Sequence, residues 1–463
     1  MDTLILTDEM KTAIALLDDD KERLIWISGR AGTGKSTFLH YLKTEIRPKN
    51  AVYLAPTGVA ALTIGGQTIH SFFWINPGDE VHMETRLDAD REGRLYPLLE
   101  KVETIVIDEI SMVRADLLDE MDRRMRRAKG EARLPFGGAR LVLFGDPYQL
   151  PPVEPDPDSH AGVLFNGRYK SPFFFSSQVL RTKARKIRRV EFTRVFRQNE
   201  EEFLATLDRC RSGLVTDADL DLLQSRVLPE GKKPPADHLV LTGKKSEVQR
   251  LNRYRLEALP GPSRSYRSEA SGRFATELDD EELPVPREIE LKVGARVLLT
   301  VNDPEHRWFN GSLATVVALG GGAVTLRDDK GEFEVPPHVW KKVRFVLRGD
   351  RLDEETTDTY SQLPLVLGWA VTIHRAQGRT LEKVFVDLSQ GAFAAGQAYV
   401  AISRVTRLEG LLLRTRPRVR DFFVHEKVSA FLDFIGEAPA TTGGAAAEGP
   451  ALAEGASALG PGN

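Results

Sequence analysis

The sequence predicts an α/β protein with two parallel sheets and a smaller β-rich insertion, and three observations lead to this fold class. Through the first half of the 463-residue chain, short apolar runs alternate with helical patterns, as in parallel sheets covered by helices. A second series of the same kind follows a basic stretch at residues 181–189. Within that series, residues 289–347 form short β-rich pieces separated by Gly and Asp turns, which indicates an inserted β-barrel.

The first half contains the expected strands of one parallel sheet. They are the apolar runs at residues 24–27, 51–54, 104–107 and 141–144. Each run ends in polar, Gly or Pro residues. Because parallel sheets bind ligands at the carboxyl ends of their strands, we expect a ligand cleft at that edge.

The second half supplies a second set of elements. Its expected strands lie at residues 238–241, 383–386 and 411–413, with amphipathic helices near 200–211 and 245–258 and barrel strands at 296–299, 314–318 and 323–326. The basic stretch before them is interpreted as a solvated face at the junction of the two halves.

These patterns divide the chain into domains. Residues 1–185 form the first α/β domain, with a short insertion at about 74–100, and residues 186–260 and 362–416 form the second. The β-barrel occupies 261–361, and a helical segment occupies 417–436. Residues 437–463 contain no aromatic or basic residue, so we expect a disordered tail.

Composition narrows the cellular setting. Cys210 is the single cysteine, which excludes internal disulfides and Cys-based zinc sites and fits a reducing cytosol. The amino terminus lacks a signal-peptide pattern, and no apolar run approaches the ~18 residues that span a bilayer. With a net charge of −3, any nucleic-acid surface must be a local patch.

Residues 29–36, Gly-Arg-Ala-Gly-Thr-Gly-Lys-Ser, lie between an apolar strand and a helical stretch and form a phosphate-binding loop. The glycines let backbone N–H groups converge on an anion at the start of the helix. Lys35 supplies a positive charge for the β and γ phosphates, and the Ser36 hydroxyl is placed to ligate Mg²⁺. The expected nucleotide-binding residues of this segment are Gly29, Gly32, Thr33, Gly34, Lys35, Ser36 and Thr37.

Two further segments complete a candidate ATP-hydrolysing site. The strand at 104–107 ends in Asp108, which would anchor the Mg²⁺ ion, and Glu109, which would activate the attacking water. The strand at 141–144 leads to Gln149, whose amide can donate to a γ-phosphate oxygen and lose that contact after hydrolysis. We therefore expect Lys35, Glu109 and Gln149 to be catalytic.

Several longer motifs follow in a fixed order along the chain. They occupy residues 55–61, 65–73, 135–139, 149–153, 195–198, 310–312, 369–380 and 399–404. With these motifs the chain resembles the superfamily 1B DNA helicases and, within them, the Pif (petite integration frequency) helicases, which are related more distantly to RecD-type enzymes. The resemblance covers roughly residues 6–415.

The resemblance implies two RecA-like P-loop domains in tandem with a small inserted SH3-like β-barrel, and ATP bound between the two domains. Arg197 and Arg404 match the arginine fingers that neutralise charge developing on the γ-phosphate. Gly378 joins the expected nucleotide contacts. One position departs from the family, because Met10 stands where a Gln usually recognises adenine, and a thioether cannot make that two-sided amide contact.

The same resemblance implies a path for single-stranded DNA across both domains. The expected DNA-binding residues are Thr57, His70, Phe72 and Pro151 in the first domain and His374, Arg375 and Gln377 in the second. Phe72, or its neighbours Phe73 and Trp74, would offer a face for base stacking. Arg375 and Ala376 replace the Lys and Ser that are more common in this motif. The insertion at 74–100 is the expected wedge that separates duplex strands.

The function implied by the resemblance is an ATP-dependent DNA helicase that uses Mg²⁺ and moves 5′ to 3′ on single strands. Its expected partners are single-stranded and forked DNA, with G-quadruplexes and RNA–DNA hybrids as further substrates, in replication, repair or recombination. We expect a monomer in the bacterial cytosol or nucleoid, with no membrane partner. Two alternatives stay open: an ATP-switched clamp on a single strand that does not unwind, and a helicase directed to RNA.

Overall fold

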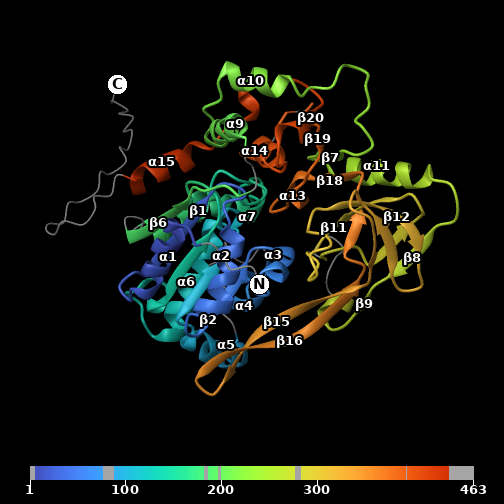
Figure 1. Cartoon of the computed structure of the whole chain (residues 1–463). Coiled ribbons are helices and arrows are strands. Elements are labelled where there is room, and N and C mark those ends of the chain that lie inside the picture. The colour runs from blue at the N-terminus through green and yellow to red at the C-terminus, as the bar shows by residue number, and fades with distance from the viewer. Residues whose placement is uncertain are drawn as a thin grey trace, which may run out of the picture.

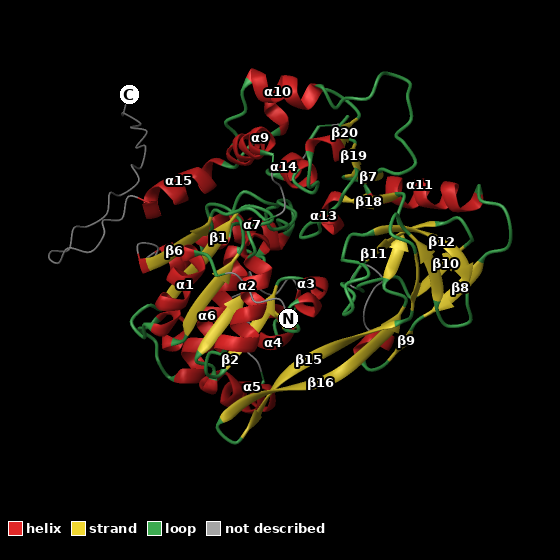
Figure 2. Cartoon of the chain, viewed as in Figure 1, coloured by secondary structure: helices red, strands yellow, loops and turns green. Residues whose placement is uncertain are grey.

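The computed structural model describes residues 6–76, 88–181, 186–196, 200–276, 283–389, 391–392 and 394–436. Two α/β lobes lie next to each other, and a β-rich domain extends from the second lobe (Figure 1). Figure 2 shows the strands of the first lobe enclosed by helices and the β-rich domain almost free of them. The expected α/β architecture with a β-rich insertion is confirmed.

The first lobe is built on a six-stranded parallel sheet in the order β3-β2-β4-β5-β1-β6. Its strands are β1 (Leu24–Gly29), β2 (Ala51–Ala55), β3 (Gln67–Thr68), β4 (Thr104–Ile107), β5 (Arg140–Phe144) and β6 (Ile187–Phe192). All six residues of β1 are buried, because helices cover both faces of the sheet. Burial on both faces explains why the central strands are continuous apolar runs rather than alternating ones.

Helices connect these strands and cover the sheet. They are α1 (Asp8–Asp18), α2 (Lys35–Tyr41), which continues as a π-helical turn over Leu42–Ile46, α3 (Gly58–Thr63), α4 (Ile69–Phe73), α5 (Ala89–Lys101), α6 (Ala115–Lys129), α7 (His160–Arg168) and α8 (Gln178–Arg181). Of the insertion expected at 74–100, the structure describes α5, while residues 77–87 lie outside the described part.

The expected boundary between the lobes at residues 185 and 186 is wrong. Strand β6 lies beyond that boundary but pairs with β1, with Leu24 opposite Ile187, so it completes the first sheet. Its apolar residues Ile187, Val190 and Phe192 are buried, and the charged residues Arg188, Arg189 and Glu191 lie between them. The basic side chains masked this edge strand in the sequence, because an edge strand needs only one apolar face.

The second lobe has a four-stranded parallel sheet in the order β18-β7-β19-β20. Its strands are β7 (Leu239–Thr242), β18 (Ala370–Thr372), β19 (Val384–Val386) and β20 (Leu411–Leu413), and its helices are α9 (Glu201–Ser212), α10 (Asp217–Gln224), α11 (Lys245–Glu257), α13 (Ile373–Ala376) and α14 (Gln397–Ile402). Phe203 and Leu207 of α9 belong to the core of this lobe. The strands expected near 238, 383 and 411 are all present.

The β-rich domain between β7 and β18 contains a five-stranded, a three-stranded and a two-stranded sheet around one core. Its elements are β8 (Arg264–Arg267), β9 (Glu269–Ala270), α12 (Arg273–Thr276), β10 (Glu288–Leu291), β11 (Arg296–Leu299), β12 (Leu313–Leu319), β13 (Val324–Arg327), β14 (Glu332–Val335), β15 (His338–Arg348), β16 (Arg351–Gln362) and β17 (Leu365–Leu367). Because β17 pairs with β11, this domain continues past the expected boundary at residue 361.

Strands β15 and β16 form a long antiparallel arm that reaches from the β-rich domain to the first lobe, where its tip lies beside α5 (Figure 1). Phe345 of the arm packs edge-on against Phe72, with ring centroids 5.7 Å apart. The ion pair between Lys101 and Asp350, at 2.7 Å, joins α5 to the tip. The sequence did not predict this arm, since its charged residues hide the alternation of a two-stranded ribbon.

A last helix, α15 (Glu426–Gly436), leaves the second lobe and packs on the first. Phe431 stacks on Phe175, with ring centroids 4.3 Å apart and planes 10° apart, and also contacts Trp26 of β1. The tail expected at 437–463 lies outside the described residues. Within the described ranges, every helix is too short or too polar to cross a bilayer.

We predict that Phe431→Ala destabilises the first lobe by about 2–4 kcal/mol, because the substitution removes a buried ring from an aromatic cluster. Denaturant-induced unfolding followed by circular dichroism measures this loss. Asp433→Ala, at an exposed position of the same helix, is the control and should leave the unfolding curve unchanged. A Phe431→Ala curve identical to that of the control would contradict the packing described.

Candidate nucleotide site between the lobes

The phosphate-binding loop connects β1 to α2 and depends on glycine at two positions. Gly29 has a φ of 147°, and a Cβ atom there would meet the carbonyl oxygen of Phe192 at 2.6 Å. Gly34 precedes α2 in the left-handed conformation, with a φ of 84°. Both positions therefore require glycine, and together they aim the start of α2 at the space between the lobes.

Lys35 points back into the loop. Its Nζ atom donates to the carbonyl oxygens of Gly29, at 2.6 Å, and Arg30, at 2.9 Å. Burial lowers the pKa of Lys35, while the carboxylates of Asp146, Glu109 and Asp108 raise it. The lysine thus lies among three acidic groups at the carboxyl ends of β4 and β5, as the sequence predicted for Asp108 and Glu109.

The acidic pair after β4 is held in an unusual backbone conformation. Glu109 has a φ of 50°, in the left-handed region that non-glycine residues rarely adopt, and its N–H donates to Asp108 Oδ1 at 2.9 Å. Burial, together with the neighbouring charge of Glu109, raises the pKa of Asp108 to about 7. Burial also raises the pKa of Glu109, and Lys35 and Arg404 act in the opposite direction.

Gln377 bridges the two lobes at this point. Its Nε2 atom, from the end of α13 in the second lobe, donates to Glu109 Oε2 at 3.2 Å and to Gln149 Oε1 at 3.3 Å. The sequence-based interpretation placed Gln377 on DNA. The structure instead brings it to the two first-lobe residues expected to act in hydrolysis.

Arg404 follows α14 and is fully buried in the seam between the lobes. Its Nε donates to the carbonyl oxygen of Val400 at 2.6 Å, and its Nη2 donates to Ser403 Oγ at 2.8 Å. Burial lowers the pKa of Arg404, and Tyr399 and Glu109 raise it. The charge of one expected arginine finger, Arg404 of the second lobe, therefore acts on Glu109 of the first, whereas Arg197 lies outside the described residues.

The remaining expected nucleotide residues belong to the loop and the start of α2, except for Gly378, which belongs to the second lobe. Ser36, Thr37 and Gly378 are exposed, and Thr33 is buried, with its hydroxyl donating to the carbonyl oxygen of Arg30. Met10 is buried beside Gly34, since a Cβ atom on that glycine would lie 3.2 Å from the Met10 methyl group. The position at which the family usually has an adenine-binding Gln thus packs against the loop.

The expected DNA-binding residues have different environments. Thr57 caps α3, accepting from Ala60 N–H at 3.2 Å, and His70 and Pro151 are half-buried. His374 and Arg375 are exposed on α13. These roles stay predictions.

The expectation that Phe72 or Phe73 stacks on a base is wrong for this structure. Both rings are buried in the core of the first lobe, and Phe72 is covered by Phe345 of the arm. Their apolar character reflects packing rather than an exposed stacking face. Trp74 is only partly buried, with the Arg94 guanidinium 5.5 Å from its ring centroid.

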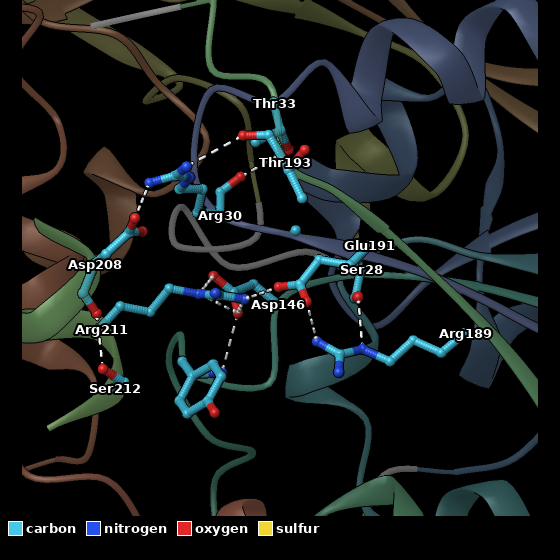
Figure 3. Close-up of polar contacts among 12 residues, drawn as sticks. Ser28, Arg30, Thr33, Asp146, Arg189, Glu191, Thr193, Asp208, Arg211 and Ser212 are labelled. Atoms are coloured by element: carbon cyan, nitrogen blue, oxygen red, sulfur yellow. Dashed lines mark hydrogen bonds and ion pairs between the residues drawn. The ribbon is translucent and has the colours of Figure 1, made fainter. Parts of the chain in front are cut away.

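The sequence-based interpretation missed a set of charged contacts between α9 and the first lobe (Figure 3). Arg30 of the phosphate-binding loop pairs with Asp208 of α9. Arg211, one turn further along α9, pairs with Asp146 at 3.0 Å. The spacing of three residues between opposite charges on an amphipathic helix is a signal for such a face, but only the fold identifies the partners.

Tyr399 of α14 is a further missed residue. Its hydroxyl accepts a hydrogen bond from the Ala31 N–H of the phosphate-binding loop, at 3.3 Å, and the side chain is buried. The second lobe therefore contacts the loop backbone directly as well as through ion pairs.

Comparison with known proteins finds a family model and several relatives. The family model described as PIF1-like helicase matches residues 5–220. The ATP-dependent DNA helicase Pif1 of Bdellovibrio bacteriovorus is 32% identical, with 89% of this chain and 89% of that protein covered. The chain belongs to the PIF1-like helicase family. It spans 58% of the length of the mouse ATP-dependent DNA helicase PIF1, to which it is 34% identical over 87% of its own length.

Solved structures of Pif1 helicase from Bacteroides have the same architecture. A double mutant superposes with a TM-score of 0.83 at 33% identity, covering 94% of this chain and 97% of that one. The complex with ADP-AlF3 and ssDNA has a TM-score of 0.63 at 33% identity, covering 94% and 98%. The expected fold class, two RecA-like domains in tandem, is confirmed, while the SH3-like form of the insertion stays a prediction.

We predict that Asp108→Asn stabilises the protein without nucleotide or divalent cations, and more strongly at pH 8 than at pH 5. Burial raises the pKa of Asp108 to about 7 from an ordinary value of 3.8. As the pH rises through this window, the unfolded chain releases the proton first, so the wild type loses stability that the asparagine variant keeps. Thermal unfolding in EDTA at both pH values measures the difference.

Asp116→Asn serves as the control for the Asp108 experiment, because Asp116 is also buried but pairs with Arg114. That variant should be less stable than the wild type at both pH values, since it leaves a partly buried guanidinium without its carboxylate. If Asp108→Asn were also less stable than the wild type at both pH values, the proposed cost of burying the ionised Asp108 carboxylate would be disproved.

Proposed function

We propose that this chain is an ATP-dependent DNA helicase that closes its two lobes on ATP and translocates 5′ to 3′ along single-stranded DNA. The observation that carries the proposal is the meeting of both lobes at Glu109. Gln377 of the second lobe donates to this carboxylate, and the charge of Arg404 acts on it from the same side. Nucleotide chemistry at that point therefore alters contacts between the lobes.

In this proposal the residues of the site have distinct roles in hydrolysis. Lys35 turns from the loop carbonyls to the β and γ phosphates. Glu109 orients and deprotonates the attacking water, and Gln149 donates to a γ-phosphate oxygen. Arg404, together with Arg197, neutralises the charge that develops on the γ-phosphate.

A magnesium ion fits the donor set at the seam. Asp108 supplies a carboxylate and Ser36 a hydroxyl, and Mg²⁺ commonly takes one or two protein oxygens with substrate phosphates and waters as its other ligands. When bound with ATP, the ion would neutralise phosphate charge.

Helix α13 is the proposed connection between DNA and the hydrolytic site. This single short helix carries His374 and Arg375 on its exposed side, and Gln377 follows it at the seam. A strand that binds the exposed pair would shift the helix and so change the hydrogen bonds of Gln377 to Glu109 and Gln149. In this proposal α13 is a short path by which bound DNA stimulates ATP turnover.

Single-stranded and forked DNA are the proposed substrates, with G-quadruplexes and RNA–DNA hybrids as further ones. A Bacteroides Pif1 complex with ssDNA and a solved structure of two coordinating Pif1 helicases at forked dsDNA support DNA as the track. We propose a monomer in the bacterial cytosol or nucleoid. The alternative of an ATP-switched clamp is less favoured, because the chain has both Glu109 and Arg404, the groups expected to act in hydrolysis, and the charge of Arg404 acts on Glu109.

Lys35→Ala is expected to abolish ATP turnover and strand displacement while leaving DNA binding intact. The variant loses the positive charge for the phosphates, but the exposed faces proposed for DNA are unchanged. Turnover with and without single-stranded DNA, together with fluorescence anisotropy of a labelled strand, separates the two properties. Normal turnover in this variant would overturn the assignment of the site.

Two forked duplexes with opposite free arms test the proposed direction. A 5′-to-3′ motor displaces the strand only where it can load on a free 5′ single-stranded arm. Displacement from the fork with a free 3′ arm alone would reverse the polarity. Strand-dependent ATP turnover without displacement on either fork would favour the clamp instead, and competition with unlabelled RNA tests the identity of the track.

A further inference from the structure

Helix α9 presents two charged side chains to the first lobe. Asp208 and Arg211 are three residues apart and therefore share one face of the helix. Asp208 pairs with Arg30 in the phosphate-binding loop, and Arg211 pairs with Asp146 after β5 (Figure 3). The opposite face of α9 supplies Phe203 and Leu207 to the core of the second lobe. The helix is thus fixed in one lobe and makes ion pairs with the other.

The contact between Arg211 and Asp146 is bidentate and desolvated. Arg211 Nη2 donates to Asp146 Oδ1 at 3.0 Å, and Nε donates to Oδ2 at 3.1 Å. The Arg211 side chain is 12% exposed and that of Asp146 is 0% exposed. Breaking such a pair from one side leaves a buried charge without compensation, so each group depends on the other.

Two more groups fix the Arg211 guanidinium. Nη2 also donates to Glu191 Oε1 at 3.1 Å, and Cζ lies 4.7 Å from the ring centroid of Tyr148. Arg189 in turn donates to the other oxygen of Glu191 and to Ser28, as Figure 3 shows. A planar guanidinium satisfies these three contacts together, whereas the ammonium group of lysine can reach only some of them.

Asp146 is the carboxylate with the largest electrostatic effect on Lys35 of the phosphate-binding loop. Among the carboxylates that raise the pKa of Lys35, Asp146 acts most strongly, ahead of Glu109 and Asp108. An unpaired Asp146 would attract Lys35 away from a triphosphate and would repel the triphosphate itself. It also lies next to Gln149, whose Nε2 is 3.5 Å from Asp146 Oδ2.

We propose that Arg211 is a positioning residue for ATP hydrolysis: from the second lobe it neutralises Asp146, so that Lys35 remains available to the triphosphate and Gln149 keeps its orientation. The inference rests on the proposed function and adds to it a group that acts through Asp146 rather than on the nucleotide. Because Arg211 belongs to the second lobe, the availability of Lys35 to the triphosphate depends on the position of that lobe.

The test compares Arg211→Ala with the double variant Arg211→Ala/Asp146→Asn. We expect Arg211→Ala to raise the KM for ATP, and the Kd for a fluorescent ADP, on the order of tenfold or more, with a smaller fall in kcat. Removing the charge of Asp146 in the same chain should restore both constants to within about threefold of the wild type, as expected for two coupled residues. Arg211→Lys should fall between these variants, because it keeps the charge without the fork.

Arg416→Ala is the matched control, since Arg416 also pairs with an aspartate, Asp221, but on the exposed surface of the second lobe. It should leave KM, kcat and Kd unchanged. Melting temperatures of all variants show whether each chain is folded. If Arg211→Ala does not fold, Arg211→Lys takes its place in the comparison.

Two results would overturn the inference. Unchanged constants in Arg211→Ala would remove any role for this residue, and a double variant as impaired as Arg211→Ala would mean that Arg211 acts on the nucleotide directly. Failure of the proposed function is distinguishable, because the wild type would then lack DNA-stimulated turnover while the ADP affinities could still be compared.

Discussion

The seam between the lobes depends on the compensation of buried negative charge. Three carboxylates lie at the carboxyl ends of two adjacent strands: Asp146 is buried, and Asp108 and Glu109 are half-buried. One lobe does not neutralise them alone, since Lys35 is the cation of the first lobe that acts on them, and Arg211 and Arg404 come from the second. Charge burial is costly without partners, so this arrangement links the position of one lobe to the chemistry of the other.

The links between the lobes differ in physical character. At the seam they are ion pairs and hydrogen bonds, and they involve α9, α13 and α14. Farther from the seam they include aromatic packing, as in the contact of Phe345 with Phe72 and the stacking of Phe431 on Phe175, together with the ion pair between Lys101 and Asp350. Apolar contacts have no preferred direction and tolerate sliding, whereas bidentate ion pairs impose a register. The bidentate pair of Arg211 with Asp146, which does impose a register, lies where the nucleotide is proposed to bind.

The fold and the core of the site were largely predictable, because strands buried on both faces and phosphate-binding loops have local signals. The run at 24–27 and the loop at 29–36 determine where Lys35 lies. The strand pattern at 104–107 determines where Asp108 lies. Partners that depend on tertiary packing were not predictable. Nothing local distinguishes Arg211, which pairs with the first lobe, from Arg209, which pairs with Asp219 inside the second lobe. The apolar Phe72 matched a stacking residue until the arm was seen to cover it.

The return of α15 to the first lobe has a consequence for the order in which the protein is made. All strands of the first sheet are present once β6 has been synthesised. Trp26 and Phe175 are covered only later, when Phe431, near the end of the described chain, has been added. At ribosomal speeds the second lobe and the β-rich domain intervene for roughly tens of seconds. During that interval the nascent first lobe carries an aromatic surface open to water and to other chains, and a chaperone that recognises such surfaces would find it there.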